Sequence, residues 1–215
     1  MKTEKINVNV EMHKYFDPSN SYSANLQMWN GKPNSAAMIN NICSFAPRTR
    51  YIIDVLVRIF NTEGERKVLI LSERRAQHTN IEKIILSEKI GTGVGYYVGG
   101  MNQKALDESA EKQIILATYQ MAAEGMNIPA LNTVIFASPI ADIQQSIGRI
   151  LREKPSERKY IPLCIDIWDE FSIFVRKGYT RIKYYKANDY VIKNFVEDAP
   201  IEDKKDVKYT FIDEE

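Results

Sequence analysis

The sequence predicts an α/β fold, a mostly parallel sheet with helices on both of its faces. Short apolar runs alternate with longer amphipathic segments along the chain, for example KVLIL (67–71), QIILAT (113–118) and NTVIFA (132–137). Strands that alternate with helices form right-handed crossovers, which make neighbouring strands parallel. A strand covered on both faces is apolar along its whole length, as these runs are.

The first third of the chain is predicted to hold one strand and two helices. Residues 5–13 alternate in polarity, and the expected inward side chains are Ile6, Val8, Val10 and Met12. After a polar loop, Asn34 or Ser35 can cap a helix, and Pro47 separates it from a second one. The apolar face of that second helix comprises Ile52, Val55, Leu56 and Ile59.

The remaining strands and helices alternate. Helices are predicted over 73–90, 105–112 and 170–186, with a helical turn over 118–129 that ends at Gly125. Further strands are predicted near 93–98 and over 159–168. After residue 188, the segments 189–197 and 207–215 could each add a strand, and a poorly ordered tail is equally consistent with the residues after 200. In a parallel sheet, ligands bind at the carboxyl ends of the strands.

Residues 138–152, SPIADIQQSIGRILR, are predicted to form one helix with two different faces. Ser138 can cap its N-terminus, and Pro139 suits the first helical position. Residues spaced to face the core are Ile143, Ile147, Ile150 and Leu151. The other side carries Gln145, Gly148, Arg149 and Arg152. Two guanidinium groups one turn apart suit a polyphosphate, so we expect both to face solvent, largely unpaired.

Bulk composition excludes several classes of protein. The net charge of +1 shows no overall basicity, so any nucleic-acid binding must come from a local patch. The apolar runs are shorter than the ~20 residues of a membrane span, and we expect neither a signal peptide nor a membrane partner. Cys43 and Cys164 form no CxxC pair, which indicates thiols rather than a metal site. The isolated His13 and His78 are interpreted as structural or surface residues.

The run from Gln145 to Arg152 resembles QxxGRxxR, motif VI of superfamily 2 helicases and translocases. In that family the motif lies on the second of two RecA-like lobes and reaches ATP held by the first. The resemblance implies a RecA-like fold, with Arg152 as the principal arginine finger, Arg149 as its companion and Gln145 orienting the γ-phosphate or the attacking water. It also places Gly148 beside the nucleotide.

Ala117-Thr118, together with EGMNIP at residues 124–129, resembles motif V of the same superfamily. The usual pattern of that motif is A-T followed by E-G-x-D-I-P. The resemblance implies a nucleic-acid phosphate contact at Thr118 and nucleotide contacts at Gly125 and Asn127. Asn127 stands where Asp is usual, so it can hydrogen-bond a ribose hydroxyl but adds no charge. One extra residue precedes Gly125, so Tyr119 and Gln120 remain alternatives for the phosphate contact.

KVLILSERR resembles the strand and exit loop of motif IV, and YVGGM resembles the element after it. The implied nucleic-acid contacts are Ser72, Arg74, Gly99 and Gly100. Contacts to the backbone suit a motor that does not read sequence, because every nucleotide offers the same phosphates. The alternatives are an N-cap, a solvated arginine and a turn.

The run 166–190 resembles the end of helicases from large cytoplasmic DNA viruses, including the poxvirus transcript-release type, and the whole resemblance covers about residues 40–190. We expect three segments: 1–33 leading in from a missing first lobe, 34–187 as the helicase C-terminal domain, and 188–215 as an extension. A cytoplasmic location follows, in a host cell or virion if the protein is viral.

The sequence lacks GxxxxGK[ST], and Asp169-Glu170 is interpreted as a helix start rather than a magnesium ligand. We therefore expect ATP with Mg²⁺ to be bound mainly by a first lobe absent from this chain, with no metal site here and no ATP hydrolysis by this chain alone. The expected partners are a DNA or RNA backbone and that first lobe.

The sequence bears on two other classes of function. A degenerate, non-catalytic scaffold that binds nucleic acid or a protein remains open because of Asn127. An unrelated Rossmann-like enzyme would need GxGxxG directly after its first strand, which is not seen.

Overall fold

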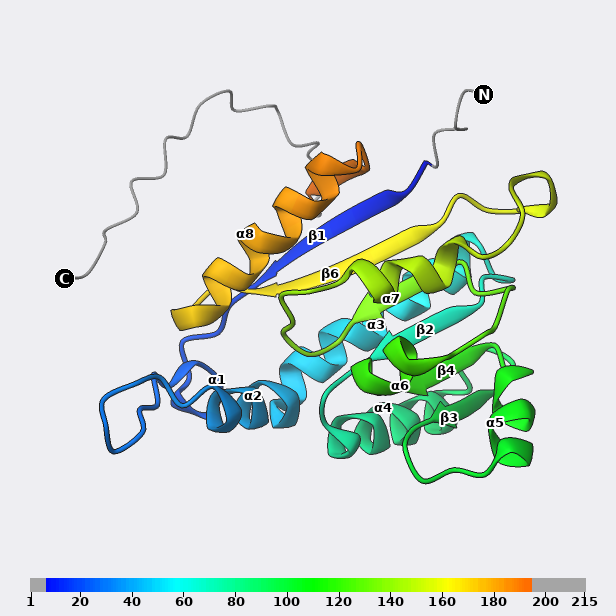
Figure 1. Ribbon diagram of the computed structural model, residues 1–215. Helices are drawn as coiled ribbons and strands as arrows, with labels where there is room; N and C mark the ends of the chain where they lie inside the picture. Colours follow the sequence, from blue (N-terminus) through cyan, green and yellow to red (C-terminus); the bar gives the residue numbers. More distant parts are fainter. Residues whose placement is uncertain (1–6, 195–215) are drawn as a thin grey trace.

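A seven-stranded sheet forms the centre of the computed structural model, which describes residues 7–194 (Figure 1). The spatial order is β3-β4-β2-β5-β6-β1-β7, and every pair of neighbouring strands is parallel. The strands are β1 (Asn9–Tyr15), β2 (Val68–Leu71), β3 (Val94–Tyr97), β4 (Ile114–Ala117), β5 (Thr133–Phe136), β6 (Leu163–Asp169) and β7 (Val191–Asn194). The predicted α/β fold is confirmed.

Helices connect these strands. They are α1 (Asn20–Ser23), α2 (Ser35–Ser44), α3 (Ala46–Thr62), α4 (Arg75–Glu88), α5 (Gln103–Ala110), α6 (Tyr119–Glu124), α7 (Gln144–Gly148) and α8 (Ser172–Ala187), with 3₁₀ turns η1 (Arg149–Leu151) and η2 (Pro155–Glu157). The Asn34 side chain accepts a hydrogen bond from the Ala37 N–H, so it caps α2 as predicted. Pro47 lies in the first turn of α3.

The sheet separates two apolar layers because successive strand residues point to opposite faces. Val68 and Ile70 of β2 pack in the layer that contains α3 and α4. Leu69 and Leu71 pack in the layer that contains Ile147 and residues of α6 and α8. A third cluster joins α1 and α2 to the start of α8, and it comprises Tyr22, Met38, Ile39, Ile42, Cys43, Phe171 and Phe174.

The segments expected before residue 34 and after residue 187 each contribute a strand to this sheet, and the division into three segments stays a prediction. β1 pairs with β6 on one side and with β7 on the other. The first strand and the last described strand therefore belong to the same sheet as the central segment. The strand predicted over 189–197 is present at Val191–Asn194, whereas Ile6 and the segment 207–215 lie outside the described residues.

The helix predicted over 138–152 is shorter than expected, because α7 begins at Gln144 and gives way to η1 at Arg149. Ser138 does not cap it. Ser138 is buried, its Oγ accepts a hydrogen bond from the Glu73 N–H at 2.9 Å, and its carbonyl accepts one from the Tyr119 hydroxyl. These contacts tie the end of β5 to the loop after β2 and hold Ser138 away from the helix.

Asp169 is the last residue of β6 rather than a helix start, and α8 begins at Ser172. The Asp169 carboxylate is buried and accepts two hydrogen bonds from the Arg48 guanidinium, at 2.7 and 2.9 Å. A second buried pair joins Arg181 to Asp166 in the same way. A buried carboxylate needs such a partner because desolvation of an isolated charge is costly.

His78 on α4 gives the fold a testable dependence on pH. Its Nε2 lies 2.8 Å from the Ala117 carbonyl, its Nδ1 is buried without a partner among the described residues, and burial lowers the pKa of His78 to about 4. The unfolded chain, with an ordinary histidine pKa of ~6.5, binds this proton more readily between those pH values. Stability should therefore fall as the pH drops below about 6.5.

We expect the free energy of unfolding to decrease by about 2 kcal/mol between pH 7 and pH 5 through this group. Urea unfolding at the two pH values checks this, with His78→Gln as the matched variant, since glutamine can donate to the same carbonyl and does not titrate. An equal pH dependence in both proteins would show that His78 does not control it.

Both cysteines are buried and free, and burial raises the pKa of the Cys43 thiol to about 11. Within residues 7–194, no helix has the length and apolar character needed to cross a membrane.

Candidate functional site

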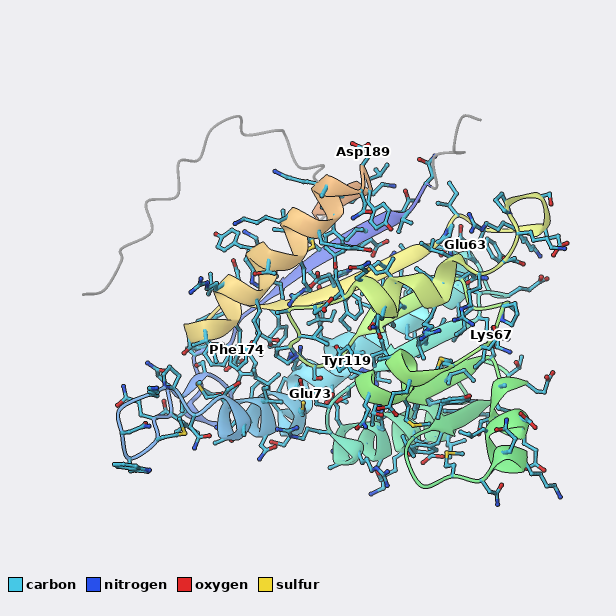
Figure 2. The ribbon with its side chains drawn as sticks, viewed as in Figure 1. Glu63, Lys67, Glu73, Tyr119, Phe174 and Asp189 are labelled. Atoms are coloured by element: carbon cyan, nitrogen blue, oxygen red, sulfur yellow. The ribbon has the colours of Figure 1, made fainter. Side chains whose placement is uncertain are left out.

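The predicted site residues gather at the edge where the parallel strands end. Ser72 follows β2 directly, Thr118 follows β4 directly, and Gly99 lies two residues after the end of β3. Figure 2 shows the two ends of the sheet, with Glu73 and Tyr119 at this edge and Lys67 at the opposite one. This is the edge at which open α/β sheets bind ligands.

We expected Arg149 and Arg152 both to face solvent without partners, and for Arg149 this expectation was wrong. Its side chain is only 8% exposed, and it donates to the carbonyls of Met126 (2.9 Å) and Ala123 (2.8 Å). These bonds fasten η1 to the loop after α6. Its Nε is buried and has no acceptor among the described residues. Burial, together with the neighbouring Arg152 cation, lowers the pKa of Arg149 below its ordinary value.

Arg152 lies on the surface as predicted, but it has a partner. Its Nη1 donates to the Asn127 Oδ1 at 2.6 Å, so the residue after η1 contacts the loop after α6 directly. Gln145 is exposed on α7. The structure thus brings Arg149, Arg152 and Asn127 together from two segments that are distant in sequence.

Two glycines border this group. Gly125 adopts a φ of +146°, a conformation that a side chain would strain, so glycine is required for the chain to leave α6 as it does. A Cβ added to Gly148 would meet no atom within 4 Å. The packing of the described residues therefore does not explain the glycine inside α7, where glycine costs about 1 kcal/mol relative to alanine.

The loop after β2 separates the roles of Ser72 and Arg74. Ser72 is fully buried, and its Oγ accepts from the Arg74 N–H at 3.0 Å, so this hydroxyl shapes the loop and is not open to a ligand. Arg74 is partly exposed. Its Nε donates to the Asn40 Oδ1 of α2 at 2.6 Å, and its Nη1 lies 3.4 Å from the Glu73 carboxylate.

The loops after β3 and β4 complete the edge. Gly99 and Gly100 are exposed, and the Gly99 carbonyl accepts a hydrogen bond from Arg75. Thr118 caps α6, with its Oγ1 accepting from the Met121 N–H. Of the two alternatives to Thr118, Tyr119 is buried against Ser138, and Gln120 is exposed and donates to Glu124.

Two features of this edge were not predicted from the sequence. Arg75 is an exposed cation at the start of α4 that joins this helix to the loop after β3, and nothing in the sequence distinguishes it from a solvated arginine. Asp166 did carry a signal, because a carboxylate inside the apolar run LCIDIW must find a buried partner.

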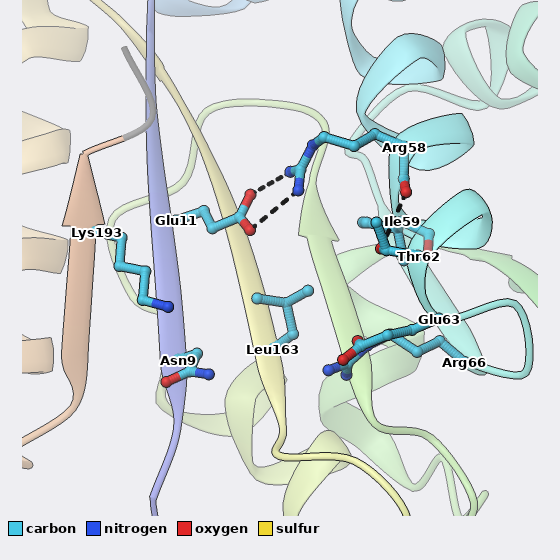
Figure 3. A pocket seen from close by; sticks show the side chains of 9 residues that line it. All are labelled: Asn9, Glu11, Arg58, Ile59, Thr62, Glu63, Arg66, Leu163 and Lys193. Carbon is cyan, nitrogen blue, oxygen red and sulfur yellow. Dashed lines mark hydrogen bonds and ion pairs between the residues drawn. The ribbon is translucent and has the colours of Figure 1, made fainter. Parts of the chain in front are cut away.

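A hollow of about 180 Å³ lies at the opposite edge, near the start of β1 and β6 (Figure 3). It is polar, and an ion pair between Glu11 and Arg58 crosses it. It contains none of the predicted site residues. In the part of the chain that the structure describes, no three His, Cys, Asp or Glu side chains gather closely enough to hold a metal ion.

Comparison with known proteins relates the chain to helicases. The family described as "Helicase conserved C-terminal domain" matches residues 50–154. A putative ATP-dependent RNA helicase, L396 of Acanthamoeba polyphaga mimivirus, is 35% identical over 186 residues, 84% of this chain. The putative ATP-dependent RNA helicase QP509L of African swine fever virus is 31% identical over 46% of this chain, and the transcript termination protein A18 of Yaba-like disease virus is 26% identical over 54%. The chain spans 35%, 19% and 26% of these relatives.

Solved structures with the same fold include UvsW of phage T4, with a TM-score of 0.66 and 18% identity over 88% of this chain and 41% of that one. Dbp5 of S. cerevisiae, solved with RNA and ADP BeF3, has a TM-score of 0.55 and 14% identity over 89% of this chain and 42% of that one. Both likenesses show the fold alone.

Proposed function

We propose that this chain supplies the arginine fingers of an ATP-dependent nucleic-acid motor, as the second RecA-like lobe of a superfamily 2 helicase. Its match to the helicase conserved C-terminal domain, its sequence similarity to helicases of large DNA viruses and its fold support this proposal. It acts with a first lobe that binds the triphosphate. The observation that carries the proposal is the convergence of Arg149, Arg152 and Asn127 from two loops at one edge of the sheet.

The residues present fit the phosphate end of ATP. Arg152 presents an exposed guanidinium, Arg149 keeps a buried Nε that lacks an acceptor, and Gly148 leaves open space beside them. ATP, with Mg²⁺ on the first lobe, supplies the energy of the motor. On this lobe, Arg152 stabilises the charge that develops on the phosphates, and Arg149 holds the loop that carries Asn127. Gln145 orients the γ-phosphate or the attacking water.

The nucleic-acid contacts lie along the same edge. Arg74 and Arg75 are cations at the start of α4, and exposed backbone at Gly99 and Gly100 lies in the adjacent loop. Thr118 keeps a hydroxyl hydrogen to donate after accepting from Met121. Ser72 positions Arg74 rather than touching the ligand. Contacts of these kinds recognise phosphates without reading the base sequence.

One observation supports the alternative of a non-catalytic scaffold. Arg149 already donates to two carbonyls, so a purely structural role accounts for most of its surroundings. Arg152→Ala distinguishes the two functions. A motor lobe predicts that this change lowers the rate of ATP hydrolysis by the two-lobe protein, whereas a non-catalytic scaffold predicts no such loss.

Binding of the 215-residue chain to single-stranded oligonucleotides should be weak and should decrease as the salt concentration rises. Each neutralised phosphate contributes a slope of about −0.7 to the plot of log K against log salt concentration, so Arg74 and Arg75 together give about −1.4. Fluorescence anisotropy with labelled oligouridylate and oligothymidylate measures it. Arg75→Ala should reduce the slope by about 0.7, while Lys159→Ala, which removes an exposed cation that precedes β6 at the opposite edge of the sheet, should leave it unchanged. Tight binding that salt does not weaken would refute the phosphate contacts.

A further inference from the structure

The loop between α1 and α2 exposes a tryptophan that no part of the proposed motor uses. Trp29 is 98% exposed, whereas Trp168, the other tryptophan of the chain, is 3% exposed. Tryptophan is highly buried on average, so nearly complete exposure is unusual. The loop protrudes beyond α1 and α2, past the ends of β1 and β6 (Figure 1, blue).

Hydrogen bonds hold this loop in one shape. Gln27 and Pro33 form an antiparallel bridge, the Met28 N–H donates to the Lys32 carbonyl at 2.8 Å, and the Gly31 N–H donates to the Met28 carbonyl at 2.9 Å. Gly31 makes the turn with a φ of +79°. Trp29 is therefore presented by a closed loop, which reduces the entropy that a ligand would have to remove on binding.

The loop is close to the proposed phosphate contacts. Arg74 donates to Asn40 of α2 and, at 3.4 Å, to the carbonyl of Ala36, in the first turn of that helix. The Asn34 N–H, one residue before α2, donates to the Leu26 carbonyl at 2.8 Å and closes the base of the loop. One continuous set of contacts thus joins the loop that carries Trp29 to the guanidinium of Arg74.

The charge of this region favours a polyanion. From Pro18 to Ile53 the sequence contains no Asp or Glu, although the whole chain has 28 acidic residues among 215. Lys32 adds a cation three residues after Trp29, and Asn and Ser side chains supply neutral hydrogen-bonding groups. Arg74 does have a carboxylate partner, Glu73, at 3.4 Å, but the loop that carries Trp29 and Lys32 contains none. An aromatic ring and cations in one region are the combination that binds single strands through stacking and phosphate contacts.

We propose that Trp29 stacks on a base of single-stranded nucleic acid, while Lys32 and Arg74 contact the neighbouring phosphates. The inference rests on the proposed nucleic-acid contacts of this lobe and extends them to the α1–α2 loop. A stacked base requires no particular sequence, because every base has a π-face.

The test uses the whole 215-residue chain and short oligouridylate. We expect Trp29→Ala to weaken binding about 5- to 150-fold, the range that corresponds to 1–3 kcal/mol for one stacked base. Trp29→Phe should restore most of the affinity, and Leu86→Ala, which truncates another exposed apolar side chain on α4, should stay within twofold of wild type. Oligouridylate should quench the tryptophan emission of wild type and of Leu86→Ala, but not that of Trp29→Ala, which retains only the buried Trp168.

The outcomes separate this inference from the function on which it rests. If Arg74→Ala weakens binding and Trp29→Ala does not, the phosphate contacts stand and the stacking role of Trp29 is wrong. If the wild-type chain binds no oligouridylate at low salt, both are wrong. Equal quenching by heparin, a polyanion without bases, would also overturn the inference, because it would show that charge alone brings the ligand to the loop.

Discussion

Replacing Arg152 with alanine, in a two-lobe protein that contains this chain, is expected to lower the rate of ATP hydrolysis about 10³-fold or more. An arginine finger stabilises charge that develops only in the transition state, and its removal costs 10³–10⁵ in rate in other NTPases. The melting temperature of the lobe should barely change, because the side chain is exposed and its hydrogen bond to Asn127 is at the surface. Steady-state phosphate release and thermal unfolding measure the two effects.

Three further variants define what the result means. Arg152→Lys keeps the charge but loses the planar fork, so it should not restore the rate. Lys154→Ala removes an exposed cation from the same loop and should leave hydrolysis near wild type. Arg149→Ala should lower both the rate and the stability, because it removes the hydrogen bonds to the carbonyls of Met126 and Ala123. If Arg152→Ala unfolds the lobe, Arg152 is a structural residue and the finger assignment is wrong.

Local patterns in the sequence predicted the strands and the buried helix faces because those patterns are themselves local. Ile52, Val55, Leu56 and Ile59 are buried on α3 as their spacing indicates. The start of α7 was not predictable in this way. The partner of the Ser138 hydroxyl is the Glu73 N–H, which lies 65 residues earlier and becomes a neighbour only when β2 and β5 pair.

The candidate site shows the same limit. Motif spacing grouped Arg149 with Arg152, and the two are close in space, but spacing does not reveal that carbonyls after α6 accept the Arg149 guanidinium. The regular helix that the spacing assumed also ends at this point, because α7 gives way to η1 at Arg149. The sequence also could not show that Arg48 pairs with Asp169 and Arg181 with Asp166, because each pair joins an arginine on a helix to a carboxylate on β6.

The pair between Arg48 and Asp169 carries the largest expected effect on stability. Both side chains are fully buried, Arg48 also donates to the Ala137 carbonyl, and the Tyr22 hydroxyl donates to Asp169 at 2.6 Å. Burial alone would lower the pKa of Arg48, but the Asp169 carboxylate raises it above its ordinary value. The cluster therefore connects α1, α3 and the ends of β5 and β6.

Asp169→Asn is expected to lower the free energy of unfolding by about 3–5 kcal/mol, because it leaves the Arg48 cation buried without its counter-charge. Urea unfolding measures the loss. Arg50→Ala, which breaks exposed pairs with Asp54 and Glu88, should cost no more than about 1 kcal/mol. The double variant Arg48→Leu with Asp169→Leu should be less destabilised than the sum of its single variants, since no unpaired charge remains. Because Tyr22 attaches α1 to Asp169, Asp169→Asn should also speed hydrogen exchange in residues 20–44. If the free energy of unfolding falls by less than about 1 kcal/mol and hydrogen exchange is unchanged, Asp169 does not anchor this segment.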